Sequence, residues 1–284
     1  MLPESLIDEA VRRALAEDRP WGDLTSDTLL PAGLAARLTL RCKQAGVICG
    51  LPAARAAFRA VDPDCHWEAA LDDGARVESG AALATVRGEA RRLLQGERVA
   101  LNFLQRLSGI ATLTAAFVAR AREGSPRVTV VDTRKTTPGL RALEKYAVRT
   151  GGGANHRFGL SDGVLVKDNH LAALAYAGVP LGEALAAARR VIPHTTRIEV
   201  EVESVPAARE AMEAGADILL LDNMSVEAMR EVVTLVRGRC LTEASGNMSL
   251  ERIATVAATG VDLISVGALT HSAPALDISL DFEI

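Results

Sequence analysis

Aromatic residues are scarce in this chain of 284 residues, and basic residues do not outnumber acidic ones. Phe, Trp and Tyr together make up 3% of the sequence, and the isoelectric point is near 5.8. Proteins that bind nucleic acid usually present a basic surface and often aromatic side chains on which bases stack. The composition therefore argues against a nucleic-acid partner and favours a small-molecule ligand.

Long apolar runs are also missing. No run approaches the ~20 residues that a membrane-spanning helix needs. The N-terminal segment MLPESLIDEAVRRALAED carries acids and an amphipathic period, where a signal peptide would be basic and then apolar. We therefore expect a cytoplasmic protein that has no membrane partner.

Cysteine is rare, and its spacing does not favour a metal site. The four cysteines show no CxxC spacing and have no histidine neighbours at the distances typical of zinc ligands. Three of them fall in the first quarter of the chain, which leaves a metal or disulfide role open but not favoured. They are Cys42, Cys49, Cys65 and Cys240.

Lysine is the scarcest charged residue, because only four of the 32 basic residues are Lys. Where Lys persists against a preference for Arg, a compact charge or an amine with an adjustable pKa is favoured over a planar guanidinium. Lys135 and Lys167 each follow an apolar, strand-like run, which indicates a functional role. Lys145 lies in the helix-like run RALEKYAVR and fits an ordinary solvated helix face equally well.

Positive charge is concentrated between Arg134 and His170. This segment has seven Lys or Arg residues against three acids, in a chain whose net charge is −4. A local excess of positive charge attracts a polyanionic small molecule. The segment therefore predicts an anion-binding active site. Its basic residues are Arg134, Lys135, Arg141, Lys145, Arg149, Arg157 and Lys167.

Residues 1–107 mix helical and strand patterns. Alternating runs predict strands at about 35–43 and 80–90, and the segment 93–112 has the apolar period of one long helix. These elements indicate an N-terminal α+β domain. Its first helix has an apolar face formed by Ile7, Val11, Ala14 and Leu15.

From Val128 onward, short β-branched runs alternate with Ala-rich helical stretches, which is typical of parallel β/α units. Polar residues gather at the C-terminal end of each run, as in a β/α barrel. A doubly wound open sheet is the alternative, but it usually has a Gly-rich fingerprint after its first strand, and none is present. We predict a barrel over 108–270 and a C-terminal segment, 271–284, that returns to the first domain.

Two carboxylates stand out at the predicted strand ends. Alternation in RIEVEVE places its Glu residues on the face opposite its Ile and Val residues. Glu201 lies nearest the C-terminal rim, and Asp222 ends the next strand, so the two could meet and hold Mg²⁺. An acid held only by a neighbouring Arg remains the alternative. Alternation alone does not separate Glu199 from Glu201.

Small residues in two late loops are candidates for binding phosphate. ASGN at 244–247 precedes a predicted helix that begins near Ser249, and SVGA at 265–268 follows the last strand. Backbone N–H groups at such places can bind an anion, and barrels commonly bind phosphate in these loops. Each segment alone is also compatible with a simple turn.

Together these segments resemble the quinolinate phosphoribosyltransferase family. The resemblance runs in order through GERVALNFLQRLSGIAT, DTRKTTPGLRALEKYAV, GGGANHRFGLSDGVLVKDNH, EVEVES, LLLDN, EASGN and SVGALTHS. It implies an N-terminal α/β sandwich domain beside an incomplete, TIM-like β/α barrel. It also implies transfer of a phosphoribosyl group from 5-phosphoribosyl-1-pyrophosphate (PRPP) to quinolinate, with Mg²⁺ and with decarboxylation to nicotinate mononucleotide. Such pentosyltransferases, which are glycosyltransferases of NAD biosynthesis, form dimers or higher oligomers with shared active sites.

The resemblance also implies roles for particular residues. Lys135, Glu201 and Asp222 would be catalytic, the two acids also lying near Mg²⁺. The quinolinate-binding residues would be Arg98 (from a neighbouring subunit), Arg134, His156, Arg157 and Lys167. The phosphate-binding residues would be Ser245, Gly246, Asn247, Ser265 and Gly267.

Three other functions remain open from the sequence. A related phosphoribosyltransferase would keep the PRPP half of the site and change the cationic pocket. An aldolase-like barrel would use Lys167 as a Schiff-base nucleophile. A non-catalytic ligand-binding protein would not need the acids that lie beside the cations.

Overall fold

The computed structural model describes residues 2–283 and divides them into two compact units. The first contains residues 2–115, 136–152 and 269–283, and the second contains residues 116–135 and 153–268. The long predicted helix is α4 (Ala90–Gly124), and its residues up to 115 belong to the first unit. Each unit is described by itself below.

A four-stranded antiparallel sheet, in the order β12-β1-β5-β3, forms the centre of the first unit. Its strands are β1 (Ala35–Cys42), β3 (His66–Ala69), β5 (Ala82–Glu89) and β12 (Ile278–Glu283). The last strand pairs with the first, from Arg37 opposite Glu283 to Cys42 opposite Ile278. The C-terminal segment therefore completes the N-terminal sheet. A two-stranded ribbon joins β2 (Gly46–Val47) to β4 (Arg76–Val77).

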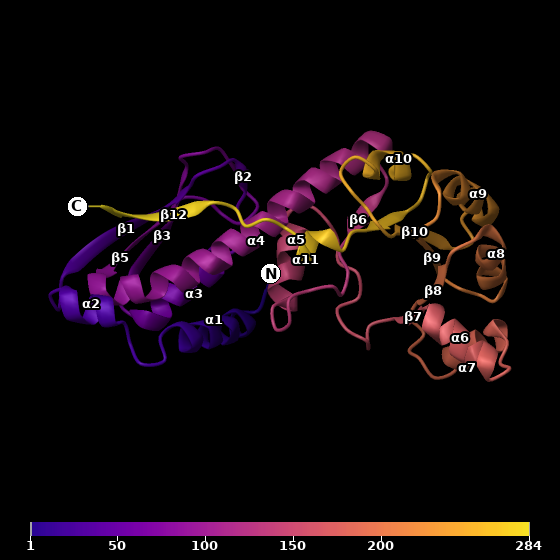
Figure 1. The fold of residues 1–284 in the computed structure, drawn as a ribbon, viewed down its shortest axis with the longest axis horizontal. Coiled ribbons are helices and arrows are strands. Elements are labelled where there is room, and N and C mark those ends of the chain that lie inside the picture. The colour runs from indigo at the N-terminus through magenta and orange to yellow at the C-terminus, as the bar shows by residue number, and fades with distance from the viewer. Residues whose placement is uncertain (1, 284) are drawn as a thin grey trace. The chain divides into compact units, whose positions relative to one another are not determined.

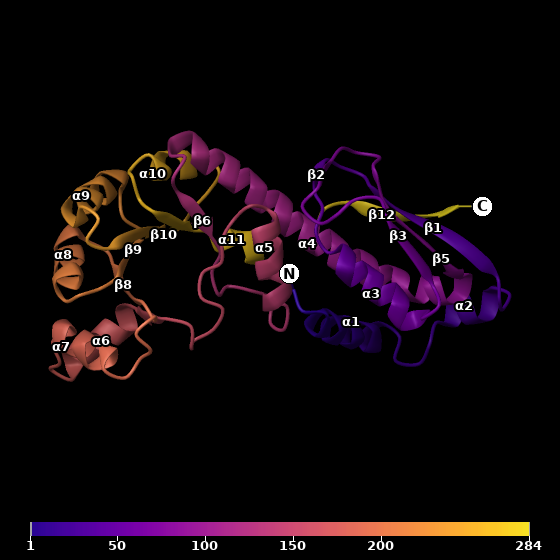
Figure 2. The same cartoon turned by 180° about the vertical axis from the view of Figure 1, so that it is seen from behind.

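The helices of the first unit bury apolar faces. Helix α1 (Glu4–Asp18) lies beside α3 (Leu51–Val61) (Figures 1 and 2). Three of the four residues predicted for the apolar face of α1, namely Ile7, Val11 and Leu15, are buried. Two other helices complete the unit: α2 (Leu24–Leu29) and α5 (Arg141–Thr150).

Helix α5 carries two buried charged residues. The side chain of Glu144 is fully buried, and Lys145 is only 3% exposed. Glu144 accepts hydrogen bonds from Arg106 at 2.8 Å, from the Thr137 backbone N–H at 3.1 Å and from the Thr137 hydroxyl at 2.8 Å. The interpretation of Lys145 as part of a solvated helix face is therefore wrong, because tertiary packing covers this face of the helix.

The second unit is built on a six-stranded parallel sheet, in the order β6-β11-β10-β9-β8-β7 (Figure 1). All six predicted runs form strands, and β6 and β7 lie at opposite edges without pairing to each other. The β/α fold and the incomplete barrel are therefore confirmed. The strands are β6 (Thr129–Val131), β7 (Val164–Val166), β8 (Ile198–Val202), β9 (Ile218–Asp222), β10 (Leu241–Ser245) and β11 (Leu263–Ser265).

Helices connect these strands and cover one side of the sheet (Figure 2). The helix predicted near Ser249 begins instead at Ile253, after a turn in which the Ile253 N–H donates to the Ser249 carbonyl at 3.0 Å. The connecting helices are α6 (Asp168–Tyr176), α7 (Leu181–Arg189), α8 (Val205–Glu213), α9 (Val226–Val236) and α10 (Ile253–Ala257). Helix α11 (Ala268–His271) follows the last strand of this sheet, and its residues from Leu269 onward belong to the first unit.

Over residues 2–283, no single helix is both long and apolar enough to cross a membrane. Only α6 and α7 taken together reach that length and composition, and they are bent by 107° relative to each other.

Candidate active site

Strand register gathers polar side chains on one face of the parallel sheet. Glu201 on β8 is paired with Leu220 on β9, and Leu220 is paired with Glu243 on β10. Paired residues of parallel neighbours point to the same face, and so do residues two positions along each strand. Glu199, Asp222 and Ser245 therefore share this face with Glu201 and Glu243. The alternation predicted for RIEVEVE is confirmed.

The same register brings Lys167 to Glu201. Val166 on β7 is paired with Val200 on β8, so the next residues along each strand are neighbours. The Lys167 ammonium lies 2.6 Å from a Glu201 carboxylate oxygen, and about half of the lysine side chain remains exposed. A cation and an acid that the sequence assigns to different substrates are thus paired directly in the free protein.

A buried aspartate at the end of β6 fixes the loop that carries His156. Asp132 is fully buried, and its two carboxylate oxygens accept from the His156 backbone N–H at 2.9 Å and from the Asn155 side-chain amide at 2.7 Å. A parallel bridge between Val131 and Ala154 adds backbone pairing next to it. Asp132 therefore fixes the position of His156 beside this face of the sheet.

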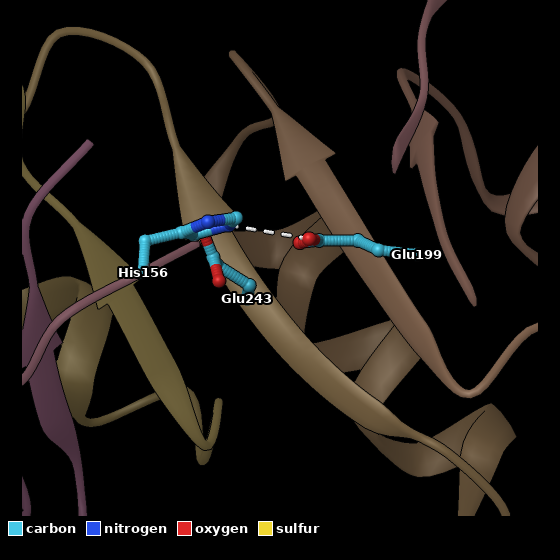
Figure 3. Close-up of side chains that lie close together, drawn as sticks. All are labelled: His156, Glu199 and Glu243. Carbon is cyan, nitrogen blue, oxygen red and sulfur yellow. Dashed lines mark ion pairs between the residues drawn. The ribbon is translucent and has the colours of Figure 1, made fainter. Parts of the chain in front are cut away.

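His156 meets two buried glutamates, one from β8 and one from β10 (Figure 3). The His156 Nε2 atom lies 3.2 Å from Glu199 and 3.6 Å from Glu243. Burial, and then the negative charge of Glu199, raise the pKa of Glu243 to about 7, although His156 and a hydrogen bond from Ser265 lower it in part. This cluster combines a histidine with a carboxyl group that titrates near neutral pH.

Two arginines lie beside this cluster. Burial and the positive charge of Arg134 lower the pKa of Arg157, whereas Glu199 and Asp162 raise it. The Arg157 guanidinium donates to the Gly163 carbonyl at 3.1 Å. The Arg134 Nε–H is buried and has no hydrogen-bond partner within residues 2–283. A buried donor of this kind carries an energetic cost that a bound carboxylate would remove.

A second group of polar residues connects the ends of β9 and β10. The Asn223 amide donates to Asp222 at 2.7 Å, and the Asn247 amide donates to Asn223 at 3.3 Å. Arg252 donates to the carbonyls of Gly246 and Met224, at 3.2 Å and 3.1 Å. These contacts hold the predicted phosphate loop against the end of β9. The chain therefore forms a turn up to Arg252, where the sequence predicted a helix beginning near Ser249.

Gly246 is required at its position by both conformation and space. Its φ of +89° favours glycine, and a Cβ built there would lie 2.1 Å from the side-chain oxygen of Asn223. We therefore expect Gly246→Ala to distort the loop and raise the KM for a phosphate-containing substrate by roughly tenfold.

Gly215→Ala is the matched control for that change. Gly215 has a φ of +93°, but no atom lies within 4 Å of its Cβ position. This variant should lose about 1–2 kcal/mol of stability from backbone strain and leave KM unchanged. Equal KM values for the two variants, measured by steady-state kinetics, would contradict the role of the loop.

The remaining predicted residues are placed as follows. Lys135 is exposed after β6, and its backbone N–H donates to the Thr133 hydroxyl at 3.0 Å. Ser265 ends β11 beside Glu243, and Gly267 follows that strand. Arg98 is exposed on the part of α4 that belongs to the first unit. Three of the seven clustered cations, Arg141, Lys145 and Arg149, also lie in the first unit, on α5.

Sequence reasoning missed three residues of this site: Asp132, Asn223 and Glu243. Each lies at the C-terminal end of a predicted strand, which is where barrel chemistry is found. That signal marked their positions, but it did not distinguish anchoring groups from groups that face a substrate.

These features define a class of protein. A parallel β/α sheet that presents paired acids and several cations at the C-terminal ends of its strands is typical of barrel enzymes acting on anionic small molecules. Comparison with known proteins narrows the class. The N-terminal domain of quinolinate phosphoribosyl transferase matches residues 23–108, and the C-terminal domain of the same enzyme matches residues 110–281.

Individual relatives are similar over nearly the whole chain. A probable nicotinate-nucleotide pyrophosphorylase [carboxylating] of Bacillus subtilis is 43% identical over 94% of this chain and 90% of its own length. The corresponding protein of Mycobacterium leprae is 42% identical over 96% of both. The crystal structure of NadC from Streptococcus pyogenes superposes with a TM-score of 0.93 at 43% identity, covering 100% of this chain and 99% of that one. The chain belongs to the quinolinate phosphoribosyltransferase family.

Proposed function

We propose that this enzyme transfers the phosphoribosyl group of PRPP to quinolinate, with loss of CO₂, to give nicotinate mononucleotide and pyrophosphate. This is a pentosyl transfer in NAD biosynthesis. The observation that carries the proposal is the buried Arg134 Nε–H, which has no acceptor among the described residues and lies near Arg157. Family membership over both domains supports the same reaction.

The proposed quinolinate pocket uses the cations around His156. Guanidinium groups match carboxylates in two-point hydrogen bonds, so Arg134 and Arg157 suit a pyridine dicarboxylate. Lys167 would bind the same substrate from the end of β7. Its ammonium would then leave Glu201, and the Glu201 carboxylate would be released. Arg98 would complete the pocket from a second copy of the chain.

The proposed PRPP half of the site lies at the late strand ends. Ser245, Gly246 and Asn247 would bind the 5-phosphate together with Ser265 and Gly267. Lys135, which is exposed at the end of β6, would bind the pyrophosphate.

Mg²⁺ is the proposed cofactor, and the available donors fit it. Glu201 and Asp222 would supply oxygen ligands from the C-terminal ends of adjacent strands, and Mg²⁺ prefers one or two carboxylates plus substrate phosphates. When bound, the ion would neutralise charge on the pyrophosphate.

The chemistry follows from charge placement. Attack of the ring nitrogen on the anomeric carbon passes through an oxocarbenium-like state, which the carboxylates of Glu201 and Asp222 would stabilise. Lys135 would stabilise the departing pyrophosphate. When the adjacent carboxylate leaves as CO₂, its bonding electron pair stays on the ring carbon, where the neighbouring positive nitrogen stabilises it, and a proton from solvent then completes the C–H bond of the product. Holding the ring in place is most of what this step requires.

We also propose that the enzyme acts in the cytoplasm as a homodimer or a higher oligomer with shared active sites. The family resemblance and the placement of Arg98 on an exposed part of α4 support this arrangement. Size-exclusion chromatography with light scattering would test it, since a monomer that is fully active would exclude shared sites.

The decisive test is an assay with defined substrates. Purified protein is incubated with PRPP, Mg²⁺ and quinolinate, and nicotinate mononucleotide is followed by mass, with nicotinate in place of quinolinate as the control. Product in the quinolinate reaction but not in the nicotinate reaction supports the proposal. Product from nicotinate alone would assign a different substrate, and no product from either would reject the transferase.

A Schiff-base role for Lys167 is disfavoured. Such lysines are activated by apolar surroundings or by a neighbouring cation. Lys167 instead pairs with Glu201 and is half exposed. Borohydride trapping with carbonyl substrates should therefore yield no adduct.

Replacing Lys167 separates the two substrates. We expect Lys167→Ala to weaken quinolinate binding by roughly 10- to 150-fold, because a charged hydrogen bond contributes about 1.5–3 kcal/mol. PRPP binding, measured by calorimetry, should change much less. Lys43→Ala, at an exposed lysine of the first unit, is the control. Equal losses for both substrates would contradict the assignment of Lys167 to quinolinate.

A further inference from the structure

The hydrogen bonds of His156 define the form of its ring. The Arg157 backbone N–H donates to His156 Nδ1 at 2.7 Å, so Nδ1 is an acceptor and carries no proton. The proton of a neutral ring is then on Nε2, which faces Glu199 at 3.2 Å. Both ring nitrogens thus have partners in the protein, and neither needs a substrate.

Two buried carboxyl groups lie close together beside the ring. Glu199 is 5% exposed and Glu243 is 1% exposed, and their contact atoms and His156 Nε2 all lie within 4.8 Å of one another. One oxygen of each carboxyl group, Oε1, is buried and has no hydrogen-bond partner among the described residues. Burial and the nearby charge of Glu199 favour the neutral form of Glu243.

A metal ion at this cluster would need a different protonation state of the His156 ring. Its coordination by His156 requires a lone pair on Nε2, but the Arg157 N–H already occupies Nδ1 and leaves the proton on Nε2. The observed hydrogen bonds therefore favour a proton over a metal between the three groups.

We propose that Glu243 is a positioning residue for quinolinate: with Glu199 it holds His156 as the neutral, Nε2-protonated ring, which anchors Arg157 at the substrate pocket. The inference rests on the proposed function for its substrate. It changes the role expected for His156, which orients Arg157 through the Arg157 backbone instead of donating a hydrogen bond to quinolinate. Other charged or polar groups that face Glu243 are Asp132 after β6 and Ser265 on β11.

The charge of Glu243 gives the arrangement a pH dependence. Its pKa is raised to about 7 by burial and by Glu199, so the neutral form is present below that pH and is lost as pH rises through it. Ionised Glu243 would place a second negative charge near the pocket for a dianion. Quinolinate affinity should therefore fall as pH rises.

The kinetic test compares wild type with Glu243→Gln, which keeps the shape and removes the titration. In wild type, the KM for quinolinate should rise roughly tenfold between about pH 6 and about pH 8, beyond any change in the KM for PRPP. In Glu243→Gln this rise should disappear. Glu203→Gln, at an exposed glutamate beyond β8, should behave like wild type. The same rise in Glu243→Gln as in wild type would overturn the proposal.

Nitrogen NMR of the His156 ring tests the cluster without any turnover. The ring should be the neutral Nε2–H form in wild type and in Glu243→Gln, and His156→Asn identifies its signals. An imidazolium, an Nδ1–H ring, or signals that shift when Mg²⁺ alone is added would overturn the proposal. If the wild-type protein shows no turnover, the proposed function is rejected. The ring signals would still show whether His156 has the proposed protonation and hydrogen bonds.

Discussion

Arg134→Ala should reduce quinolinate affinity by roughly 10- to 150-fold and leave PRPP affinity nearly unchanged. The guanidinium has a buried Nε–H with no partner among the described residues, so a substrate carboxylate would satisfy it. A hydrogen bond to a charged partner contributes about 1.5–3 kcal/mol, which corresponds to this range. Isothermal calorimetry with each substrate separately measures both affinities.

Arg134→Lys distinguishes geometry from charge. Lysine keeps the positive charge but lacks the planar fork that binds a carboxylate at two points. Its quinolinate affinity should lie between those of wild type and Arg134→Ala. Full affinity in Arg134→Lys would show that charge alone suffices, and full affinity in Arg134→Ala would remove Arg134 from the quinolinate pocket.

Glu144→Ala should cause the largest loss of stability, about 3–5 kcal/mol. This carboxylate is fully buried and binds Arg106 at 2.8 Å as well as the backbone and hydroxyl of Thr137. Arg106 also donates to the carbonyls of Thr270 and Ala273. Removing one partner of such a pair leaves a largely buried charge without compensation. The midpoint of urea unfolding is the measurement.

Two controls define that prediction. Glu144→Gln keeps the shape of the side chain and one of its two acceptor oxygens, and it should lose less stability. Glu9→Ala removes an exposed glutamate that lies 3.9 Å from Arg13, and it should change stability by no more than about 1 kcal/mol. If Glu144→Ala and Glu9→Ala unfold at the same urea concentration, the network around Glu144 is not a stabilising one.

Local sequence patterns predicted most of the elements. Alternation identified β1 and β5, the apolar period identified α4, and all six barrel strands were recognised from short β-branched runs. The helix expected near Ser249 was misplaced because small residues after β10 form a turn fixed by Arg252 and Asn223, which lie far apart in sequence.

The exposure of α5 could not be predicted from its sequence. Glu144 and Lys145 have the residue types of a solvated face, and local period alone favours that interpretation. Glu144 binds Arg106 of α4, which also donates to the Thr270 carbonyl. Contacts of this kind are set by tertiary packing, and the basic residues of this segment are divided between the two units.

The sequence by itself determined which residues are available for the chemistry. Period-two alternation placed Glu199 and Glu201 on one face of β8, and the motifs indicated the family and its substrates. Only the tertiary structure decided which of these groups meet. Lys167 at the end of β7 meets Glu201 on the neighbouring β8, and the His156 loop meets Glu199 on β8 and Glu243 on β10, although these segments are remote in sequence. Distance and burial then decide which carboxylates lie beside the histidine and which one holds the lysine, and these quantities have no local signature in the chain.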